Sequence, residues 1–269
     1  MPRLAWLSDL HLDHAPEAAI EAFLSQLQAA EADWVLIGGD TGEARNFVDF
    51  LTMIAGSVAA DVCFVLGNHD YYRSSVVSAR SEAARLNQSG LAKWLPEAGV
   101  VELDETTALV GHGGWGDARI GDVFGSDVFL NDYVLIDELR EVASPGFMTD
   151  ELVERLNFLG DDAASKLQTN VAPALQQYNH VIVLTHVPPY IESAWHEGQC
   201  SDDNWAPHFT CKAVGDMLKA EMSAQPSKLM TVLCGHTHGE GSAQILPNLE
   251  VRTALARYGQ PAVYCTIEV

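Results

Sequence analysis

Five short apolar runs, each followed at once by polar residues, constrain the fold of this chain most strongly. The runs are Leu4–Leu7, Trp34–Ile37, Val62–Leu66, Val181–Leu184 and Met230–Leu233. Their length and their content of β-branched residues are typical of buried strands. The sequence therefore predicts a largely buried sheet whose strands end in polar loops.

The segments between the first three runs have the apolar spacing of helices. From residue 17 to 31 apolar side chains recur at i, i+3, i+4 and i+7, at Ile20, Phe23, Leu24 and Leu27. The pattern returns at Phe47, Phe50, Leu51 and Ile54, and Gly56 fits a helix end. This order of strands and helices predicts parallel strands with helices outside the sheet.

Further elements are expected along the rest of the chain. We expect a strand at Thr107–Val110, a helix at Gly160–Tyr178, and short strands at Ala243–Leu246, Leu249–Thr253 and Val263–Ile267. Two irregular stretches, at about residues 113–158 and 190–210, are expected to be insertions that shape a pocket. With no internal repeat or clear linker, residues 1–269 are predicted to form a single domain.

Chemically reactive side chains gather where the predicted strands end. They are Asp9, His11, Asp40, Asn68, His69, Asp70, His186, His236 and His238. In open α/β sheets ligands bind outside the carboxyl ends of strands, and carboxylate, imidazole and amide groups suit divalent transition metals. His236 and His238 can direct two imidazoles at two ions, and Asp40 is the best candidate to bridge them.

These residues form an ordered set of sequence blocks. The blocks are Asp9-x-His11, Gly39-Asp40, Gly67-Asn68-His69-Asp70, His186 and Gly235-His236-x-His238. Their order and composition resemble the signature of the calcineurin-like metallophosphoesterases, over residues 9 to 238 of the chain. The resemblance implies an α/β (α+β) fold in which two stacked mixed β-sheets are flanked by helices, a four-layer sandwich.

The resemblance also implies a role for each block. Asp9, His11 and His238 would hold one metal, and Asn68, His186 and His236 would hold the second. Asp40 would bridge the two ions, together with a water or hydroxide. His69 would act as the general acid facing the scissile phosphate, and Asp70 would orient its imidazole ring.

The implied activity is hydrolysis of phosphate esters by a hydroxide that bridges two divalent metals. The mixed nitrogen and oxygen ligands favour Mn, Fe, Zn, Co or Ni over Mg alone, without selecting one. Phosphodiesterase and phosphomonoesterase activities both remain open, because a diester only requires room on both sides of the phosphate. A nuclease and a non-catalytic interaction scaffold are the alternatives, and the intact His69 disfavours the scaffold.

The charge of the chain limits its partners. Lys and Arg number 15 against 37 Asp and Glu, which gives a formal net charge of −22. Such a surface disfavours nucleic acid and anionic membranes, so we expect a small organic phosphate as substrate, with nucleotides among the candidates. The oligomeric state stays open.

The compartment is predicted from two features. The N-terminal segment reaches Asp9 after a short apolar run, unlike a signal peptide. The five cysteines are scattered and form no Cys-x-x-Cys pair, as expected for reduced thiols. Both features favour a cytoplasmic protein.

A few residues outside the blocks are candidates for binding the organic part of a substrate. Tyr71 and its neighbour Tyr72 would either stack on a substrate ring or pack the loop. Trp115 and Trp205 would line the two pocket-forming loops. Arg119 would bind phosphate or form an ion pair with Asp117 or Asp122. His112 is a further residue that either lines the cleft or is structural, and the structural role is favoured.

Overall fold

Two β-sheets stack at the centre of the molecule in the computed structural model, which describes residues 1–144 and 146–269. The first sheet has the strand order β13-β1-β2-β3-β4. Its strands are β1 (Arg3–Leu7), β2 (Trp34–Ile37), β3 (Asp61–Phe64), β4 (Lys93–Trp94) and β13 (Cys265–Glu268). Strands β1 to β4 run parallel, as the alternation of strands and helices predicts, and β13 pairs antiparallel with β1.

The second sheet has the strand order β11-β12-β10-β7-β6-β5. Its strands are β5 (Val101–Glu102), β6 (Thr107–Gly111), β7 (His180–Leu184), β10 (Leu229–Cys234), β11 (Gly241–Leu246) and β12 (Leu249–Thr253). Its four central strands are parallel, and the two edge strands β5 and β11 pair antiparallel with their neighbours. The chain therefore forms two mixed sheets.

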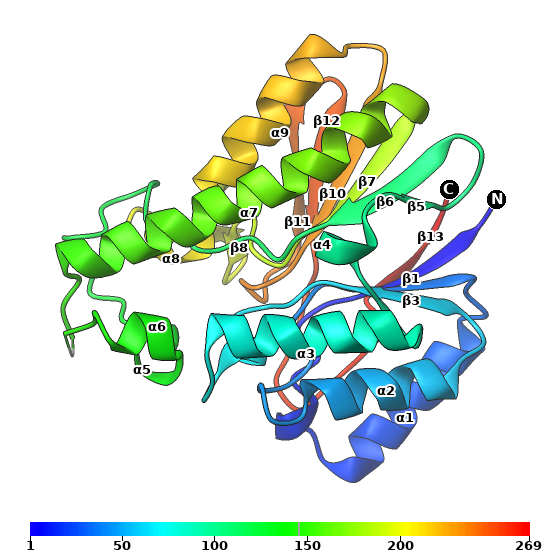
Figure 1. The fold of residues 1–269 in the computed structure, drawn as a ribbon, viewed down its shortest axis with the longest axis horizontal. Coiled ribbons are helices and arrows are strands. Elements are labelled where there is room, and N and C mark those ends of the chain that lie inside the picture. Colours follow the sequence, from blue (N-terminus) through cyan, green and yellow to red (C-terminus); the bar gives the residue numbers. More distant parts are fainter. Residues whose placement is uncertain (145) are drawn as a thin grey trace.

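Helices cover the outer face of each sheet, so the molecule has four layers (Figure 1). The helices on the first sheet are α1 (Glu17–Ala29), α2 (Phe47–Ser57) and α3 (Val76–Ser89), and those on the second are α7 (Asp150–Gln177) and α9 (Lys212–Ala224). Alternation along β1 shows how the layers arise, because Ala5 and Leu7 face the helices while Leu4 and Trp6 face the second sheet. The predicted fold class is confirmed.

The helical content exceeds the sequence prediction. Helix α7 begins at Asp150 rather than Gly160, because the Thr149 hydroxyl caps it by accepting the Leu152 N–H at 3.1 Å. The last part of the expected insertion 113–158 is therefore helix. Helices α3 and α9 were not predicted.

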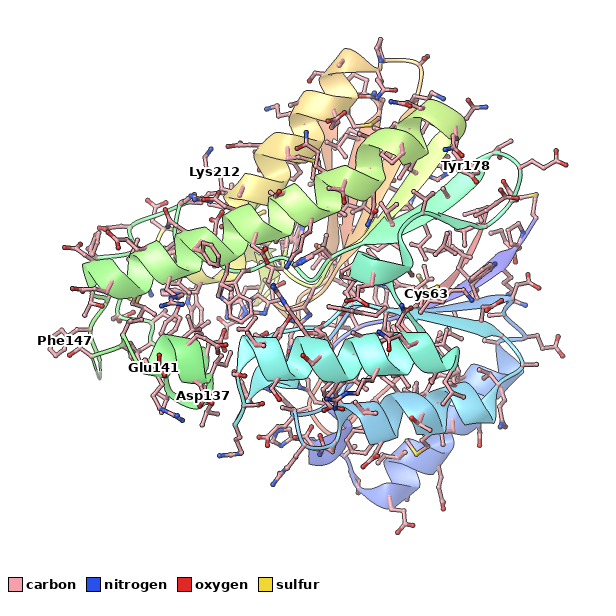
Figure 2. The ribbon with its side chains drawn as sticks, in the orientation of Figure 1. Cys63, Asp137, Glu141, Phe147, Tyr178 and Lys212 are labelled. Carbon is pink, nitrogen blue, oxygen red and sulfur yellow. The ribbon has the colours of Figure 1, made fainter. Side chains whose placement is uncertain are left out.

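Short elements complete the fold. They are the helices α4 (Leu95–Ala98), α5 (Asp132–Leu135), α6 (Asp137–Arg140) and α8 (Ala206–Phe209), and the hairpin of β8 (Trp195–His196) and β9 (Gln199–Cys200). Three 3₁₀ turns are η1 (Leu12–His14), η2 (His69–Tyr71) and η3 (Ile191–Ser193). In Figure 2 the side chains of Asp137, Glu141 and Phe147 mark the α6 end of the molecule, far from Tyr178 at the end of α7.

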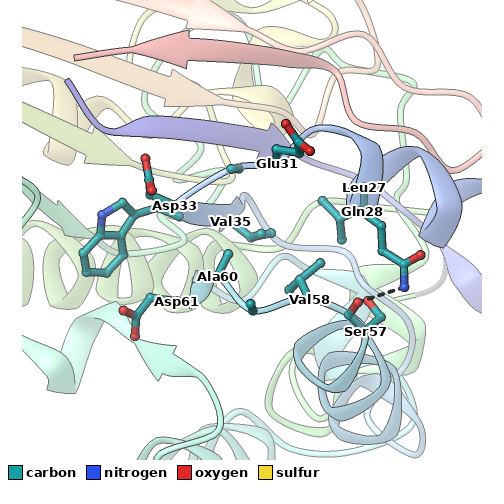
Figure 3. A pocket seen from close by; sticks show the side chains of 12 residues that line it. Leu27, Gln28, Glu31, Asp33, Val35, Ser57, Val58, Ala60 and Asp61 are labelled. Atoms are coloured by element: carbon teal, nitrogen blue, oxygen red, sulfur yellow. Dashed lines mark hydrogen bonds between the residues drawn. The ribbon is translucent and has the colours of Figure 1, made fainter.

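All five cysteines are free thiols, as the sequence predicts. Among the described residues, none of the helices has the length and apolar character needed to cross a membrane. A cavity of about 600 Å³ lies at the amino ends of β2 and β3, between α1 and α2, with Glu31, Asp33 and Asp61 at its rim (Figure 3). It lies at the opposite end of these strands from the reactive side chains.

Candidate metal centre

The loops after β1, β2, β3, β7 and β10 bring all nine strand-end residues of the sequence prediction to one edge of the stacked sheets. Most are almost completely buried. Five of them adopt positive φ angles, namely Asp9, His11, Asp40, His236 and His238. Residues other than glycine rarely adopt this conformation, and it concentrates at functional sites.

Three of these side chains converge with their lone pairs facing one another. Asn68 Oδ1 lies 2.9 Å from His186 Nε2 and 3.0 Å from His236 Nδ1, and the two ring nitrogens are 3.2 Å apart. These distances bring three potential ligand atoms to a single point.

The remaining polar atom of each side chain faces outward to a partner. His186 Nδ1 donates to the Gly38 carbonyl at 2.9 Å, and His236 Nε2 faces the His208 carbonyl at 3.2 Å. The Asn68 amide donates to Asp132 at 2.8 Å. Because the donors are engaged outside, three acceptor atoms meet with no proton between them, and a cation fits this donor set.

A second group of ligand atoms lies beside the first. His11 Nε2 is 3.1 Å from His238 Nε2, which is 3.4 Å from Asp9 Oδ1. The Asp9 carboxylate is fixed by the Ser8 hydroxyl at 2.5 Å and by the backbone N–H of His236 at 3.0 Å. This group also has the composition and spacing of a metal site.

Asp40 lies between the two groups. Its Oδ2 atom is 3.5 Å from His186 Nε2 and 3.7 Å from His11 Nε2, whereas Oδ1 accepts the His69 N–H at 2.8 Å. Burial, followed by the nearby Asp9 carboxylate, raises the pKa of Asp40 well above its usual range. A cation on each side would offset that cost, so Asp40 fits the bridging position.

The pKa of Asp9 moves the other way. Burial alone would raise it, but His186 and then His238 and His11 lower the pKa of Asp9 well below its usual range. Burial also lowers the pKa of His11 to about 2 and that of His236 to about 3. These imidazoles are therefore neutral near pH 7, the form that ligates a metal.

Glycine is required at a position next to these ligands. A Cβ at Gly235 would collide with the Asp9 carboxylate and the Ser8 hydroxyl. The sequence block Gly235-His236-x-His238 thus includes glycine because the loop passes directly against Asp9, a member of the second group.

His69 lies beside both groups of ligand atoms, and with His11 and Asp40 it forms a further set of side chains close enough to share a metal ion. Its Nε2 is 4.0 Å from Asp40 Oδ2 and 3.5 Å from the Tyr258 hydroxyl, and its ring stacks on Tyr72 with centroids 4.2 Å apart. Within the described part of the chain, Nδ1 is buried without a hydrogen-bond partner. Burial, followed by His186, lowers the pKa of His69 to about 3.

The expectation that Asp70 orients the His69 ring is wrong. Both carboxylate oxygens of Asp70 accept backbone N–H groups, at 2.9 to 3.2 Å. The donors are Asp40, Thr41, Gly42 and Gly67. Backbone donors outcompete the imidazole here, so Asp70 ties the loop after β2 to the loop after β3.

A cavity of about 230 Å³ opens over the ligand atoms. Leu130, Asn131 and Asp132 line it from the first expected insertion, and His196 and Phe209 line it from the second. Tyr258 forms a further wall from the segment between β12 and β13. Sequence reasoning missed Asp132 and Tyr258.

Two of the expected substrate-binding residues lie in the core instead. Tyr71 and Trp115 are only 5% and 4% exposed, and their rings contact each other edge to face at 5.5 Å. Neither residue lines the cavity. At the η2 turn it is Tyr72, not Tyr71, whose side chain lines it. The packing alternative therefore applies to Tyr71, and the expected role of Trp115 is wrong.

The other candidates are also displaced from the ligand atoms. Arg119 forms ion pairs with Asp117 at 3.1 Å and Asp161 at 2.7 Å, which supports its structural alternative. Trp205 stacks on Phe209, whose ring lies 5.2 Å from His236, so it backs a wall of the cavity. His112 is buried and lines a separate small cavity.

Comparison with known proteins gives a consistent result. A family model described as calcineurin-like phosphoesterase matches residues 2–240. No curated protein matches the chain.

Three solved structures are similar to the chain at low sequence identity. Phosphopantetheinyl hydrolase from Mycobacterium tuberculosis has a TM-score of 0.67 at 14% identity, over 96% of this chain and 90% of that one. A dimetal phosphatase from Danio rerio has a TM-score of 0.55 at 13% identity, over 98% and 89%. A 5'-nucleotidase from Candida albicans has a TM-score of 0.51 at 11% identity, over 96% and 46%.

At these identities the solved structures show a shared fold alone. The family match is independent of them, and it spans the loops that carry all nine strand-end residues. On this evidence the chain belongs to the calcineurin-like phosphoesterase family.

Proposed function

We propose that the protein hydrolyses phosphate esters of small organic molecules with the help of two divalent metal ions. The observation that carries the proposal is the convergence of Asn68 Oδ1, His186 Nε2 and His236 Nδ1, whose donors are all engaged elsewhere. Such an arrangement of acceptors has little use without a cation. The names of two structural neighbours, a phosphopantetheinyl hydrolase and a dimetal phosphatase, agree with this reaction class.

The ligands divide between two sites around Asp40. Asp9, His11 and His238 would hold one ion, and Asn68, His186 and His236 the other, with Asp40 shared by both. When bound, the ions supply positive charge to phosphoryl oxygens and lower the pKa of a water molecule toward neutrality. Mn, Fe, Zn, Co and Ni all suit this set of nitrogen and oxygen ligands.

His69 acts on the leaving group. Its Nε2 atom faces the cleft beside Asp40 Oδ2 and the Tyr258 hydroxyl, and stacking on Tyr72 fixes the plane of the ring. A proton at Nε2 can hydrogen-bond to the departing oxygen and be transferred to it as the ester bond breaks. A negatively charged phosphoryl group nearby would favour the protonated ring and so act against the lowering of its pKa by burial.

Metal analysis combined with a hydrolysis assay tests the proposal. The purified protein, loaded with Mn²⁺ or Zn²⁺, should bind about two ions per chain and hydrolyse nitrophenyl phosphate monoesters or diesters. Asp40→Asn should abolish activity and release at least one ion, because the shared negative charge is lost. A wild-type protein that stays metal-free after loading would refute the proposal.

A further inference from the structure

Tyr258 forms part of the cleft although it lies beyond residues 2–240, which the family model matches. It belongs to the irregular segment that connects β12 of the second sheet to β13 of the first. Its ring centroid is 4.4 Å from that of His11 and 5.0 Å from that of His238. The residue is still 52% exposed, so part of its ring can contact a ligand.

A second cavity, of about 370 Å³, adjoins the one over the ligand atoms. His69, Tyr72, Asn131 and Tyr258 line both cavities and form the boundary between them. The volume lies within the range of small-molecule binding pockets, about 300–1,000 Å³. The protein therefore has room for an organic group on the far side of His69 from the ligand atoms.

The position of His69 decides which part of a substrate this cavity would hold. In the proposed function, on which this inference rests, the leaving oxygen receives a proton from His69. The carbon attached to that oxygen must then lie next to the imidazole. The second cavity is the space that adjoins His69 away from the ligand atoms.

The walls of the second cavity indicate the chemistry of its occupant. Tyr258 offers the part of its ring that is not packed against His11, and the exposed Asn131 offers both a donor and an acceptor. At the far side Arg73 pairs with Glu43 at 3.0 Å, which places further donors and acceptors at the rim. An aromatic face bordered by mixed donors and acceptors suits a planar ring with a hydrogen-bonding edge.

We propose that this second cavity is the subsite for the leaving group, and that it takes a nucleoside-sized alcohol carrying a planar heteroaromatic ring. Tyr258 is its specificity-determining residue, because its ring provides the stacking face. The substrate class is thereby narrowed to phosphate esters of such alcohols.

A binding experiment tests the subsite without any chemical step. Adenosine, guanosine, cytidine and uridine carry no phosphate, and each is titrated against the metal-loaded protein, with ribose as the reference. At least one nucleoside should bind about 5–100-fold more tightly than ribose, the range expected for stacking of one base. Tyr258→Ala should remove this difference and Tyr258→Phe should retain it. If no nucleoside binds better than ribose, the subsite proposal is wrong.

A kinetic comparison separates the subsite from the proposed function. The ratio of kcat/KM for a nucleoside 5'-monophosphate to that for ribose 5-phosphate should fall about 5–100-fold in Tyr258→Ala. Tyr178→Ala is a matched control at the far end of α7, and the ratio should be unchanged there (Figure 2). An unchanged ratio in Tyr258→Ala overturns the subsite, whereas loss of metal binding and nitrophenyl ester hydrolysis by the wild type overturns the proposed function.

Discussion

Asp132 should control the affinity of the proposed metal site formed by Asn68, His186 and His236, although it is not one of its ligands. Its Oδ1 atom accepts the Asn68 amide at 2.8 Å and the Tyr72 hydroxyl at 2.7 Å, and the residue is 4% exposed. The bond to the amide holds the Asn68 carbonyl oxygen toward His186 and His236. In Asp132→Ala the amide loses this partner and can turn its NH₂ group toward the metal position.

The expected magnitude follows from the bond between Asp132 and the Asn68 amide. This hydrogen bond is buried and charge-assisted, and removing such an outer partner of a metal ligand typically lowers metal affinity about 10–100-fold. That range corresponds to about 1.4–2.7 kcal/mol. Loss of the buried Asp132 carboxylate beside the proposed ions would act in the same direction.

Competition with a chelator measures the two metal sites separately. We expect Asp132→Ala to weaken one of the two binding steps about 10–100-fold and to leave the other close to wild type. Asp132→Asn should lose less, because its amide oxygen can still accept the Asn68 N–H. Asp137→Ala, which removes an exposed carboxylate paired with Arg140, is the matched control (Figure 2). If a folded Asp132→Ala protein binds both ions with wild-type affinity, the orienting role is wrong.

Two further predictions follow from His69 and His112. His69→Asn should keep both ions yet lose about 10²–10⁴-fold in kcat on esters with a poor leaving group. The loss should be smaller for nitrophenyl esters, whose leaving group needs little protonation. Equal losses on the two kinds of ester would instead indicate an electrostatic role. Burial, followed by Arg80, lowers the pKa of His112 from 6.5 to about 3. Between pH 6.5 and about pH 3, therefore, only the unfolded chain takes up a proton at this imidazole. Stability should therefore be lost as the pH falls below 6.5, by up to about 1.4 kcal/mol per unit, and urea unfolding of His112→Gln should show a flatter dependence.

The sequence predicted that the strand-end side chains would lie together, because each follows a recognisable strand; their role as metal ligands stays a prediction. Within each sheet the parallel strands end on the same side, and the stacking of the two sheets then brings Asp9, after β1, close to His238, after β10. Helix α3 was not predicted, although both of its ends carry recognisable signals. Ser75 caps the N-terminus by accepting the Ser78 N–H, and Gly90 ends the helix with a φ of 78°. Its buried face is built partly from alanine, which weakens the apolar pattern.

The walls of the cleft could not be predicted in the same way. Asp132 contacts Asn68 across 64 residues, and Tyr258 approaches His69 across 189 residues. Such contacts depend on how loops pack over the sheet edge, and no local pattern encodes that packing. The position of Asp70 next to His69 in the sequence was also misleading. Its carboxylate accepts hydrogen bonds from four backbone N–H groups instead of from the His69 imidazole.

The proposed metal centre would explain how a chain with a net charge of −22 could act on an anion. Asp40 and Asp132 line the cavity over the proposed ligand atoms and Asp9 lies beside Asp40, and on their own these three buried carboxylates would repel a phosphate group. Under the proposed function two divalent ions would bring four positive charges to this cluster, which would leave a net positive charge there. Salt ions at physiological ionic strength screen the electrostatic field of the acidic surface within about 8–10 Å, whereas they screen the field of buried charges much less. We therefore expect phosphate affinity to follow the local charge of the proposed metal centre, and to depend on metal loading far more than on the charge of the surface.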